Sequence, residues 1–384
     1  MANYTEIRSM LGTLHHVAST MKDMELEQTV AEDIRAACRE MNSQLYYHPV
    51  LKIECPYDCI SNLEQLLPVW EDTLRSREQH PMDEEFWEIY DFFKYVDAEV
   101  IYQKVLGHFR SLPEGQQIEY LSLPQRYTFL TGKLDFVAED YSLIQIYVEM
   151  MSREVEKYRW LYEHLADYRS KRTLNGIIKY WFEFNIIDLH RYTENIFSDY
   201  YDMDILQCGA EDVLVDLGAY TGDSILNYIQ NYRDYKKIYA YEITPGTYQT
   251  LLNNLKDYPD IDARQKGVGR KSDSMYADDN KDYAGNKLLE VGEIPVEVVA
   301  LDEDIHENIT VVKMDIEGAE KDALIGMQNH IEREKPALLI STYHIPDDIF
   351  EIPYMIYTMR YDYEFYLRFN GRGIWPCDYV LLAR

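Results

Sequence analysis

The sequence predicts a doubly wound α/β domain with a mostly parallel sheet, preceded by a mainly α-helical region. After Cys208, short apolar runs alternate with helix-like segments, as in parallel sheets that helices cover on both faces. Before about residue 200, apolar residues recur every three or four positions instead, as on one face of a helix. We therefore expect a helical hairpin over 1–45, a mainly helical domain over 46–200 and the sheet domain over 201–384.

The candidate strands are short apolar runs of the sheet domain. The last two, 363–369 and 378–383, lie close enough in sequence to pair as an antiparallel hairpin at one edge of the sheet. The earlier runs are expected to be parallel because helical segments separate them. They are 213–217, 238–242, 296–301, 309–315 and 337–342.

Residues 1–45 are typical of two amphipathic helices. The second carries an apolar stripe at spacings of three and four, formed by Leu26, Val30, Ile34, Cys38 (or Ala37), Met41 and Leu45. Helices this short bury little apolar surface alone. We expect them to pack on the rest of the chain or on a second copy, in which case they form the oligomerisation element of a homodimer.

The chain of 384 residues carries a formal charge of −30, which excludes some classes of partner. A surface so acidic repels phosphate backbones and anionic lipids, so we expect neither nucleic acid nor a membrane surface as a partner. The N-terminal residues lack a basic segment followed by an apolar core, and no uncharged apolar run is long enough to span a bilayer. These features predict a cytoplasmic protein.

The segment from Val213 to Ser224, VLVDLGAYTGDS, is the centre of the predicted sheet domain. An apolar strand leads into Asp216, and two glycines follow before a helix-like run. Glycine is needed where the backbone adopts a positive φ or approaches a ligand closely. Gly218 and Gly222 meet that need, and the next helix offers unpaired N–H groups at its start. The segment therefore predicts a strand, a glycine turn and a helix beside a ligand.

Three carboxylates, Asp216, Glu242 and Asp315, lie at the ends of predicted strands. Ligands of doubly wound sheets bind beyond the carboxyl ends of the strands, where the strand order reverses. Glu242 follows Gly218 by 24 residues, the length of one strand–helix–strand unit. A carboxylate at that place accepts hydrogen bonds from ribose hydroxyls, so the first unit predicts a nucleoside-like ligand.

The glycine spacing distinguishes two such ligands. Dinucleotide sites favour G-x-G-x-x-G, with the pyrophosphate at the helix N-terminus. Here the spacing is Gly218-x-x-x-Gly222, with Asp216 before the turn and Asp223 after it. Two carboxylates repel a pyrophosphate but suit a sulfonium that carries an amino group. The turn therefore favours S-adenosylmethionine over a nicotinamide cofactor.

Further motifs extend over residues 158–384. They are VLVDLGAYTGDS (213–224), YAYEITP (239–245), QKGVG (265–269), ALDED (300–304), VVKMDIEGAEKDALIGMQNHIEREKPALLISTYHIPDDIFEIP (311–353) and YEFYLRF (363–369). In these motifs, of which KMDIEGAE and HIPDD are the most specific, the chain resembles the FkbM family of S-adenosylmethionine-dependent methyltransferases. The resemblance implies a Rossmann-like methyltransferase sheet and methylation, usually of an oxygen on a sugar or natural-product scaffold. The expected partner is a carbohydrate-like small molecule.

The resemblance also implies which residues hold the donor. Asp315 would lie beside its methyl group, and Glu242, followed by Ile243, would hold its ribose. The glycine turn would line its methionine part through Asp216, Gly218 and Gly222, and Ala219, Tyr220 and Thr221 between them would also bind the donor. The adenine would be bordered by a loop around Gly267, Val268 and Gly269, with Ser272. Asp302 is explained equally well as a pocket residue or as a solvated carboxylate in a turn.

Four residues near the fourth and fifth strands are the candidate catalytic groups: Lys313, Asp315, Glu317 and His344. Methyl transfer to a hydroxyl requires an aligned acceptor and a group that helps to remove its proton. An unperturbed histidine has a pKa near 6.5, which suits a base at neutral pH. Asp315, Glu317 and His344 could instead bind a divalent cation, an alternative that we do not favour at this point. Glu320 is explained equally well by the helix macrodipole.

Two other functions stay open from the sequence. The long helical region suits a scaffold protein that binds the donor without catalysis, although the intact set of Asp216, Gly218, Glu242 and Asp315 argues against lost catalysis. A nicotinamide-dependent oxidoreductase is the other alternative, and the glycine spacing disfavours it. The preferred prediction is an O-methyltransferase.

Overall fold

The computed structural model describes residues 10–14, 16–18, 32–34, 36–38, 41, 63, 67, 81–197, 199–277 and 287–384. The chain divides into two compact units, residues 1–101 and 102–384. The three domains expected from the sequence stay a prediction. Within the described ranges, no helix combines the length and the apolar character that a membrane crossing requires.

Apart from Val96 and Asp97, the residues described in the first unit are helical, and they include α4 (Pro81–Tyr95). Three residues of the predicted apolar stripe, Ile34, Cys38 and Met41, are buried. The other three predicted positions of the stripe, residues 26, 30 and 45, lie outside the described residues. The homodimer expected through these helices stays a prediction.

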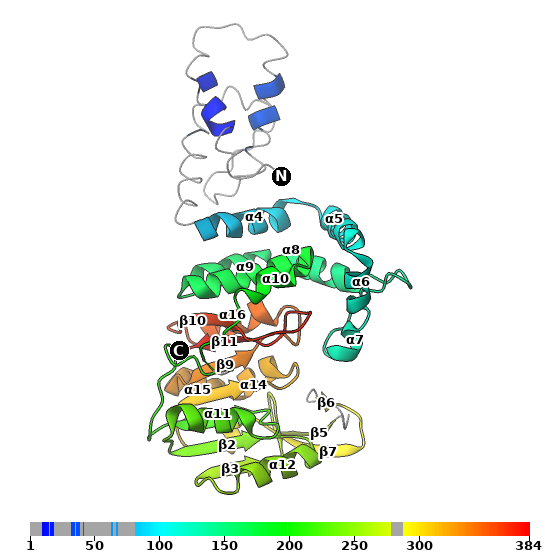
Figure 1. The fold of residues 1–384 in the computed structure, drawn as a ribbon. Helices are drawn as coiled ribbons and strands as arrows, with labels where there is room; N and C mark the ends of the chain where they lie inside the picture. Colours follow the sequence, from blue (N-terminus) through cyan, green and yellow to red (C-terminus); the bar gives the residue numbers. More distant parts are fainter. Residues whose placement is uncertain are drawn as a thin grey trace. The chain divides into compact units, whose positions relative to one another are not determined.

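The second unit begins with helices. Its long helices are α8 (Ser142–His164) and α9 (Tyr168–Glu183), and α9 starts where the Asp167 carboxylate accepts a hydrogen bond from the backbone N–H of Ser170. Helix α9 contacts strand β10 and α8 contacts α16, so these helices lie against the sheet region (Figure 1). The remaining helices before the sheet are α5 (Ala98–Ser111), which contains the boundary between the units, α6 (Glu114–Tyr120), α7 (Leu123–Arg126) and α10 (Ile186–His190).

The main sheet has seven strands in the order β10-β11-β9-β8-β1-β2-β3. The strands are β1 (Val213–Leu217), β2 (Lys237–Tyr241), β3 (Ile261–Arg264), β8 (Val311–Met314), β9 (Ala337–Ser341), β10 (Phe365–Phe369) and β11 (Tyr379–Ala383). Strands β3, β2, β1, β8 and β9 are parallel, and β11 is antiparallel to both β9 and β10. The predicted fold class and its edge hairpin are therefore confirmed. The strand order reverses between β1 and β8, which sets the expected place for a ligand.

One predicted strand belongs to a different sheet. The run 296–301 was expected among the parallel strands, but β7 (Ile294–Val299) lies in a four-stranded sheet of order β4-β7-β5-β6. Its exposed Pro295 and Glu297 alternate with buried residues, a pattern that suits a strand with one face in solvent. The other members are β4 (Gly267–Val268), β5 (Asp273–Ala277) and β6 (Leu288–Leu289). Strand β3, which the prediction missed, is a short edge strand with polar residues.

Alternate residues of the main sheet form one apolar core with two helices. These helices are α11 (Asp223–Tyr232) and α12 (Pro245–Leu255). Their buried Ile225, Tyr228 and Leu251 share a cluster with Leu214 of β1 and Ile238 of β2. The helices that follow the second sheet are α13 (Leu301–Asp304), α14 (Glu320–Gly326), α15 (Gln328–Glu334) and α16 (Asp348–Met359), and α16 contacts α14, α15 and β11.

Candidate active site

A cavity of about 340 Å³ lies beyond the carboxyl ends of β1, β2 and β8, beside the point where the strand order reverses. Its volume is within the range of small-molecule sites, about 300–1,000 Å³. The predicted site residues that line it are Gly218, Tyr220, Glu242, Ile243, Gly267, Val268, Lys313, Asp315 and Glu317. The structure thus brings together residues from three strand ends and from β4. Asp216, Ala219, Thr221, Gly222 and His344 lie outside this lining.

The turn after β1 can form only with glycine at its first position. Gly218 has a φ of +76°, and an added Cβ would collide with the backbone carbonyl oxygen of Asp315. The backbone N–H groups of Gly218 and Ala219 both donate to the carbonyl oxygen of Tyr241, at 3.1 and 2.9 Å. Gly222, with a φ of +88°, begins α11. The turn is therefore fixed against β2 and β8, the strands on either side of β1.

A buried ion pair between Lys313 and Asp216 stabilises this turn. The Nζ atom of Lys313 lies 3.1 Å from Oδ1 of Asp216 and donates to the carbonyl oxygen of Gly218 at 2.7 Å. The hydroxyl of Ser224 donates to the other carboxylate oxygen of Asp216. Burial lowers the pKa of Lys313, but the carboxylates of Asp216 and Asp315 outweigh it and leave that pKa raised. Lys313 therefore stays charged and positions the turn.

Glu242 presents a preorganised carboxylate to the cavity. The side chain is only 7% exposed. One carboxylate oxygen accepts from the backbone N–H of Tyr220 at 3.1 Å, and the other from the backbone N–H of Thr244 at 2.7 Å. Burial raises the pKa of Glu242, and these hydrogen bonds offset that effect in part. The side chain of Thr244 also hydrogen-bonds to this carboxylate, which has about four acceptor positions, so at least one position is left for a ligand.

Ser272, expected near the adenine, and Asp302, considered as a pocket residue or a solvated carboxylate, have other partners. The exposed Ser272 donates its hydroxyl hydrogen to Glu303 at 2.6 Å. The carboxylate of Asp302 accepts from the backbone N–H groups of Asn329 and His330, at 3.0 and 3.2 Å. Asp302 thus accepts from backbone N–H groups in the first turn of α15, which have no partner within the helix. Neither Ser272 nor Asp302 lines the cavity.

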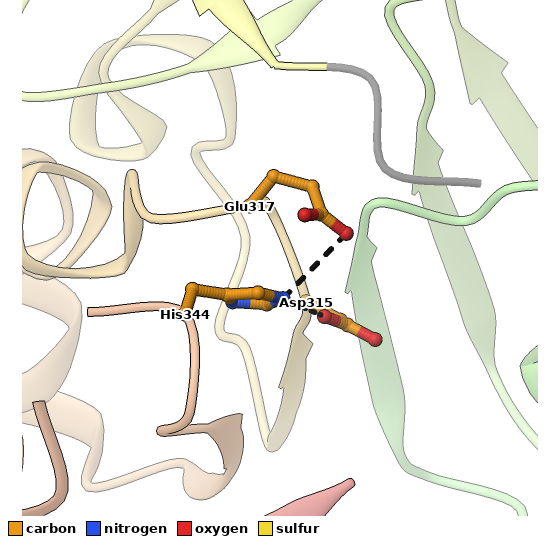
Figure 2. Close-up of side chains that lie close together, drawn as sticks. All are labelled: Asp315, Glu317 and His344. Atoms are coloured by element: carbon orange, nitrogen blue, oxygen red, sulfur yellow. Dashed lines mark ion pairs between the residues drawn. The ribbon is translucent and has the colours of Figure 1, made fainter. Parts of the chain in front are cut away.

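Asp315, Glu317 and His344 converge at one side of the cavity (Figure 2). Nε2 of His344 lies 3.3 Å from Oδ1 of Asp315 and 3.5 Å from Oε1 of Glu317. Nδ1 of His344 lies 2.9 Å from Oε1 of the buried Glu320. Glu317 has a φ of +57°, and Gly318 follows with a φ of +99°. This left-handed turn brings the Glu317 side chain back toward the end of β8.

The charges of this cluster are strongly coupled. Burial lowers the pKa of His344, but the carboxylates of Glu320, Glu317 and Asp315 outweigh it and leave that pKa well above the ordinary value. Burial raises the pKa of Asp315, and His344, Lys313 and a hydrogen bond from Tyr200 more than offset it, so the pKa of Asp315 is lowered. An isolated cluster therefore holds an imidazolium ring among carboxylates.

Sequence reasoning missed several residues of this site, among them Tyr200 and Asp378. The hydroxyl of Tyr200 donates to Oδ2 of Asp315 at 2.6 Å. Tyr343 and Asp378 also line the cavity. Tyr200 lies in irregular backbone between the helices and β1, and it is one of 35 tyrosines, so no pattern distinguished it. For Glu320, the spacing KMDIEGAE gave no reason to expect a bond to a histidine 24 residues away.

Comparisons with known proteins found one family model and several solved structures that are similar to this chain. The family model described as "Methyltransferase FkbM domain" matches residues 216–365. The crystal structure of methyltransferase FkbM from Methylobacillus flagellatus KT is similar with a TM-score of 0.52 and 23% identity, over 62% of each chain. An rRNA methylase from Streptococcus thermophilus has a TM-score of 0.30 and 14% identity, over 47% of this chain and 89% of its own. A search of curated proteins gave no significant match.

At 23% identity, the similarity to the Methylobacillus structure shows only that the two chains share a fold. The aligned part spans 62% of that structure's length.

Proposed function

Because residues 216–365 form a methyltransferase FkbM domain, we propose that this chain transfers a methyl group from S-adenosylmethionine to a hydroxyl of a carbohydrate or a similar natural product. The observation that carries the proposal is the Glu242 carboxylate, which two backbone N–H groups fix at the edge of the cavity. Ribose hydroxyls can donate to its remaining lone pairs. The donor, when bound, supplies a methyl group on a positively charged sulfur.

The walls of the cavity suit such a donor. Gly218 lines the cavity, and the carbonyl oxygen of Asp315 occupies the place that its Cβ would take, so the backbone of the turn itself faces the ligand. The carboxylates of Asp315 and Glu317 line the side of the cavity across the sheet from Glu242. Negative charge there favours a cationic sulfur over a pyrophosphate.

At the methyl carbon, the transfer step makes one bond and breaks one. The acceptor oxygen attacks the methyl carbon, the carbon–sulfur bond breaks, and its electron pair stays on sulfur. The hydroxyl proton must leave the acceptor, and we propose that it passes to a carboxylate oxygen of Glu317. Asp315 and Glu317 line the cavity whereas His344 does not. We therefore propose that His344, expected from the sequence as the base, acts by holding these carboxylates.

A second cavity supports a hydroxyl-rich acceptor. It has a volume of about 450 Å³ and shares Asp378 with the first cavity. Its lining is mainly polar, with Asn195, Asp199, Asn227, Asn370 and Arg372. Amides both donate and accept hydrogen bonds, as sugar hydroxyls do. An acceptor that occupies this cavity would reach the first one past Asp378.

The test is a methyl-transfer assay with isotopically labelled S-adenosylmethionine and a panel of sugars and hydroxylated metabolites. The proposal expects labelled methyl ethers in the wild type and a loss of at least about a hundredfold in turnover for Glu317→Gln, the size of one lost general-base contribution. The matched control is Glu303→Gln, an exposed carboxylate outside the cavity. Label on nitrogen or carbon would contradict O-methylation. Donor binding without transfer to any acceptor would favour the scaffold alternative.

A further inference from the structure

We propose that Asp315, Glu317 and His344 bind a divalent transition-metal ion at the side of the cavity. The role of this ion in catalysis rests on the proposed function, but its binding does not. The three side chains come from two neighbouring strand ends, since Asp315 and Glu317 follow β8 and His344 follows β9. Figure 2 shows them pointing toward one another.

The separation of the three ligand atoms fits one ion. Nε2 of His344, Oδ1 of Asp315 and Oε1 of Glu317 all lie within 4.8 Å of one another. Two ligands at about 2.1 Å from a metal, with a tetrahedral angle between them, are about 3.4 Å apart. The distances from Nε2 to the two carboxylate oxygens, 3.3 and 3.5 Å, match that value.

Two of these atoms are buried and unsatisfied. Nε2 of His344 and Oδ1 of Asp315 are at ion-pair distance but are not aligned as a hydrogen bond, and among the described residues neither atom has a hydrogen-bond partner. His344 as a whole is only 4% exposed. A buried polar atom without a partner is costly. A metal ion between these atoms would satisfy both.

The opposite atoms of two of the three ligands, His344 and Asp315, already have partners. Glu320, which is fully buried, accepts from the backbone N–H of Ile316, and its same oxygen faces Nδ1 of His344. A carboxylate there accepts the Nδ1 proton, which leaves the lone pair on Nε2 of a neutral ring. Tyr200 likewise holds Oδ2 of Asp315. Such outer partners fix the tautomer and direction of metal ligands.

A second acidic cluster shows the contrast. Glu154, Asp347 and Glu351 also lie close together. However, Lys157 pairs with both glutamates, and Arg153 lies 3.0 Å from Asp347. Protein cations already neutralise that cluster, so it offers no vacancy for a metal. In the cluster at the cavity, His344 is the ion-pair partner of Asp315 and Glu317 among the described residues, and its ring becomes a ligand when neutral.

The donor set indicates the kind of ion. One imidazole nitrogen and two carboxylate oxygens suit Mn²⁺, Fe²⁺ or Zn²⁺ better than Mg²⁺, which prefers oxygen ligands alone. Three protein ligands leave positions open, as in catalytic sites. Asp315 and Glu317 line the cavity, so these positions face it. An ion there would lower the pKa of an acceptor hydroxyl and would assist its loss of a proton.

The test measures Mn²⁺ binding to the full chain, without donor or acceptor, by loss of the electron paramagnetic resonance signal of free Mn²⁺. We expect one tight site per chain. His344→Gln and Glu317→Gln should each weaken binding at least tenfold, and Glu320→Gln, a positioning variant, by about 10–100-fold. Glu351→Gln, in the ion-paired cluster, is the matched control and should bind as the wild type does.

Several results would overturn the proposal. They are no tight Mn²⁺ binding, equal binding by all the variants, or loss of binding in the Glu351→Gln control. Urea unfolding of each variant checks that it is folded, and His344→Asn replaces His344→Gln if that variant fails this check. A chain that binds Mn²⁺ but no S-adenosylhomocysteine refutes the proposed function and leaves the ion site standing. A chain that methylates hydroxyls and binds no Mn²⁺ refutes the ion site and leaves the proposed function standing.

Discussion

Glu242→Gln should weaken the binding of S-adenosylhomocysteine by about tenfold to a hundredfold. The variant keeps the shape of the side chain and removes its charge. Hydrogen bonds to a charged group contribute about 1.5–3 kcal/mol, and each 1.4 kcal/mol is about tenfold in the dissociation constant. The glutamine amide also has a single acceptor atom for the N–H groups of Tyr220 and Thr244, which the carboxylate satisfies with two oxygens.

Isothermal titration calorimetry measures this loss directly. Glu334→Gln is the matched control, because Glu334 also accepts from a backbone N–H, that of Ile309 at 2.8 Å, and does not line the cavity. The control should cost stability and leave affinity unchanged. Unchanged affinity in Glu242→Gln would refute the assignment of Glu242 to the ribose. If both variants lose the same affinity for S-adenosylhomocysteine, the loss reflects reduced stability of the fold and not a contact with the ligand.

Three predictions concern stability, and urea unfolding tests each. Gly218→Ala should lower the unfolding free energy by at least about 1 kcal/mol, because its φ is +76° and the added Cβ meets backbone; no loss would contradict that turn. Lys313→Met should cost about 3–5 kcal/mol, since it leaves the buried Asp216 carboxylate unpaired, and a loss below 1 kcal/mol would contradict the ion pair. Burial raises the pKa of Asp348 to about 6, against the partial opposing effect of Lys321. This carboxyl stabilises the fold fully below its unfolded pKa near 3.8, and that contribution, about 3 kcal/mol, is lost as the pH rises to about 6. The unfolding free energy of Asp348→Asn should therefore fall less than that of the wild type between pH 4 and 6. If the two unfolding free energies depend on pH in parallel, the raised pKa of Asp348 is excluded.

The residues that the sequence placed correctly are those whose positions depend on local pattern. A strand followed by a glycine turn and a helix fixes Gly218 at the carboxyl end of β1, and one further strand–helix–strand unit fixes Glu242 at the end of β2. Parallel strands end at the same edge, so Asp315 at the end of β8 joins them. These three residues were predictable because chain geometry alone brings them together.

The residues that escaped prediction depend on tertiary contacts. Asp216 lies in β1 one residue before its end at Leu217, and its side chain lies outside the cavity lining and pairs with Lys313 from the neighbouring strand. Tyr200 reaches Asp315 from irregular backbone 115 residues earlier. Strand β7 has the composition of a parallel strand but pairs with the antiparallel β5, and only its alternating exposure, visible in the structure, distinguishes it. Spacing along one chain segment carries no information about such partners.

A crystal structure with S-adenosylhomocysteine tests the central claim most directly. We predict the adenosine beyond the ends of β1 and β2, with both ribose hydroxyls within hydrogen-bond distance of the Glu242 carboxylate and the sulfur facing Asp315. Adenosine bound elsewhere, or a ribose without contact to Glu242, would contradict the account.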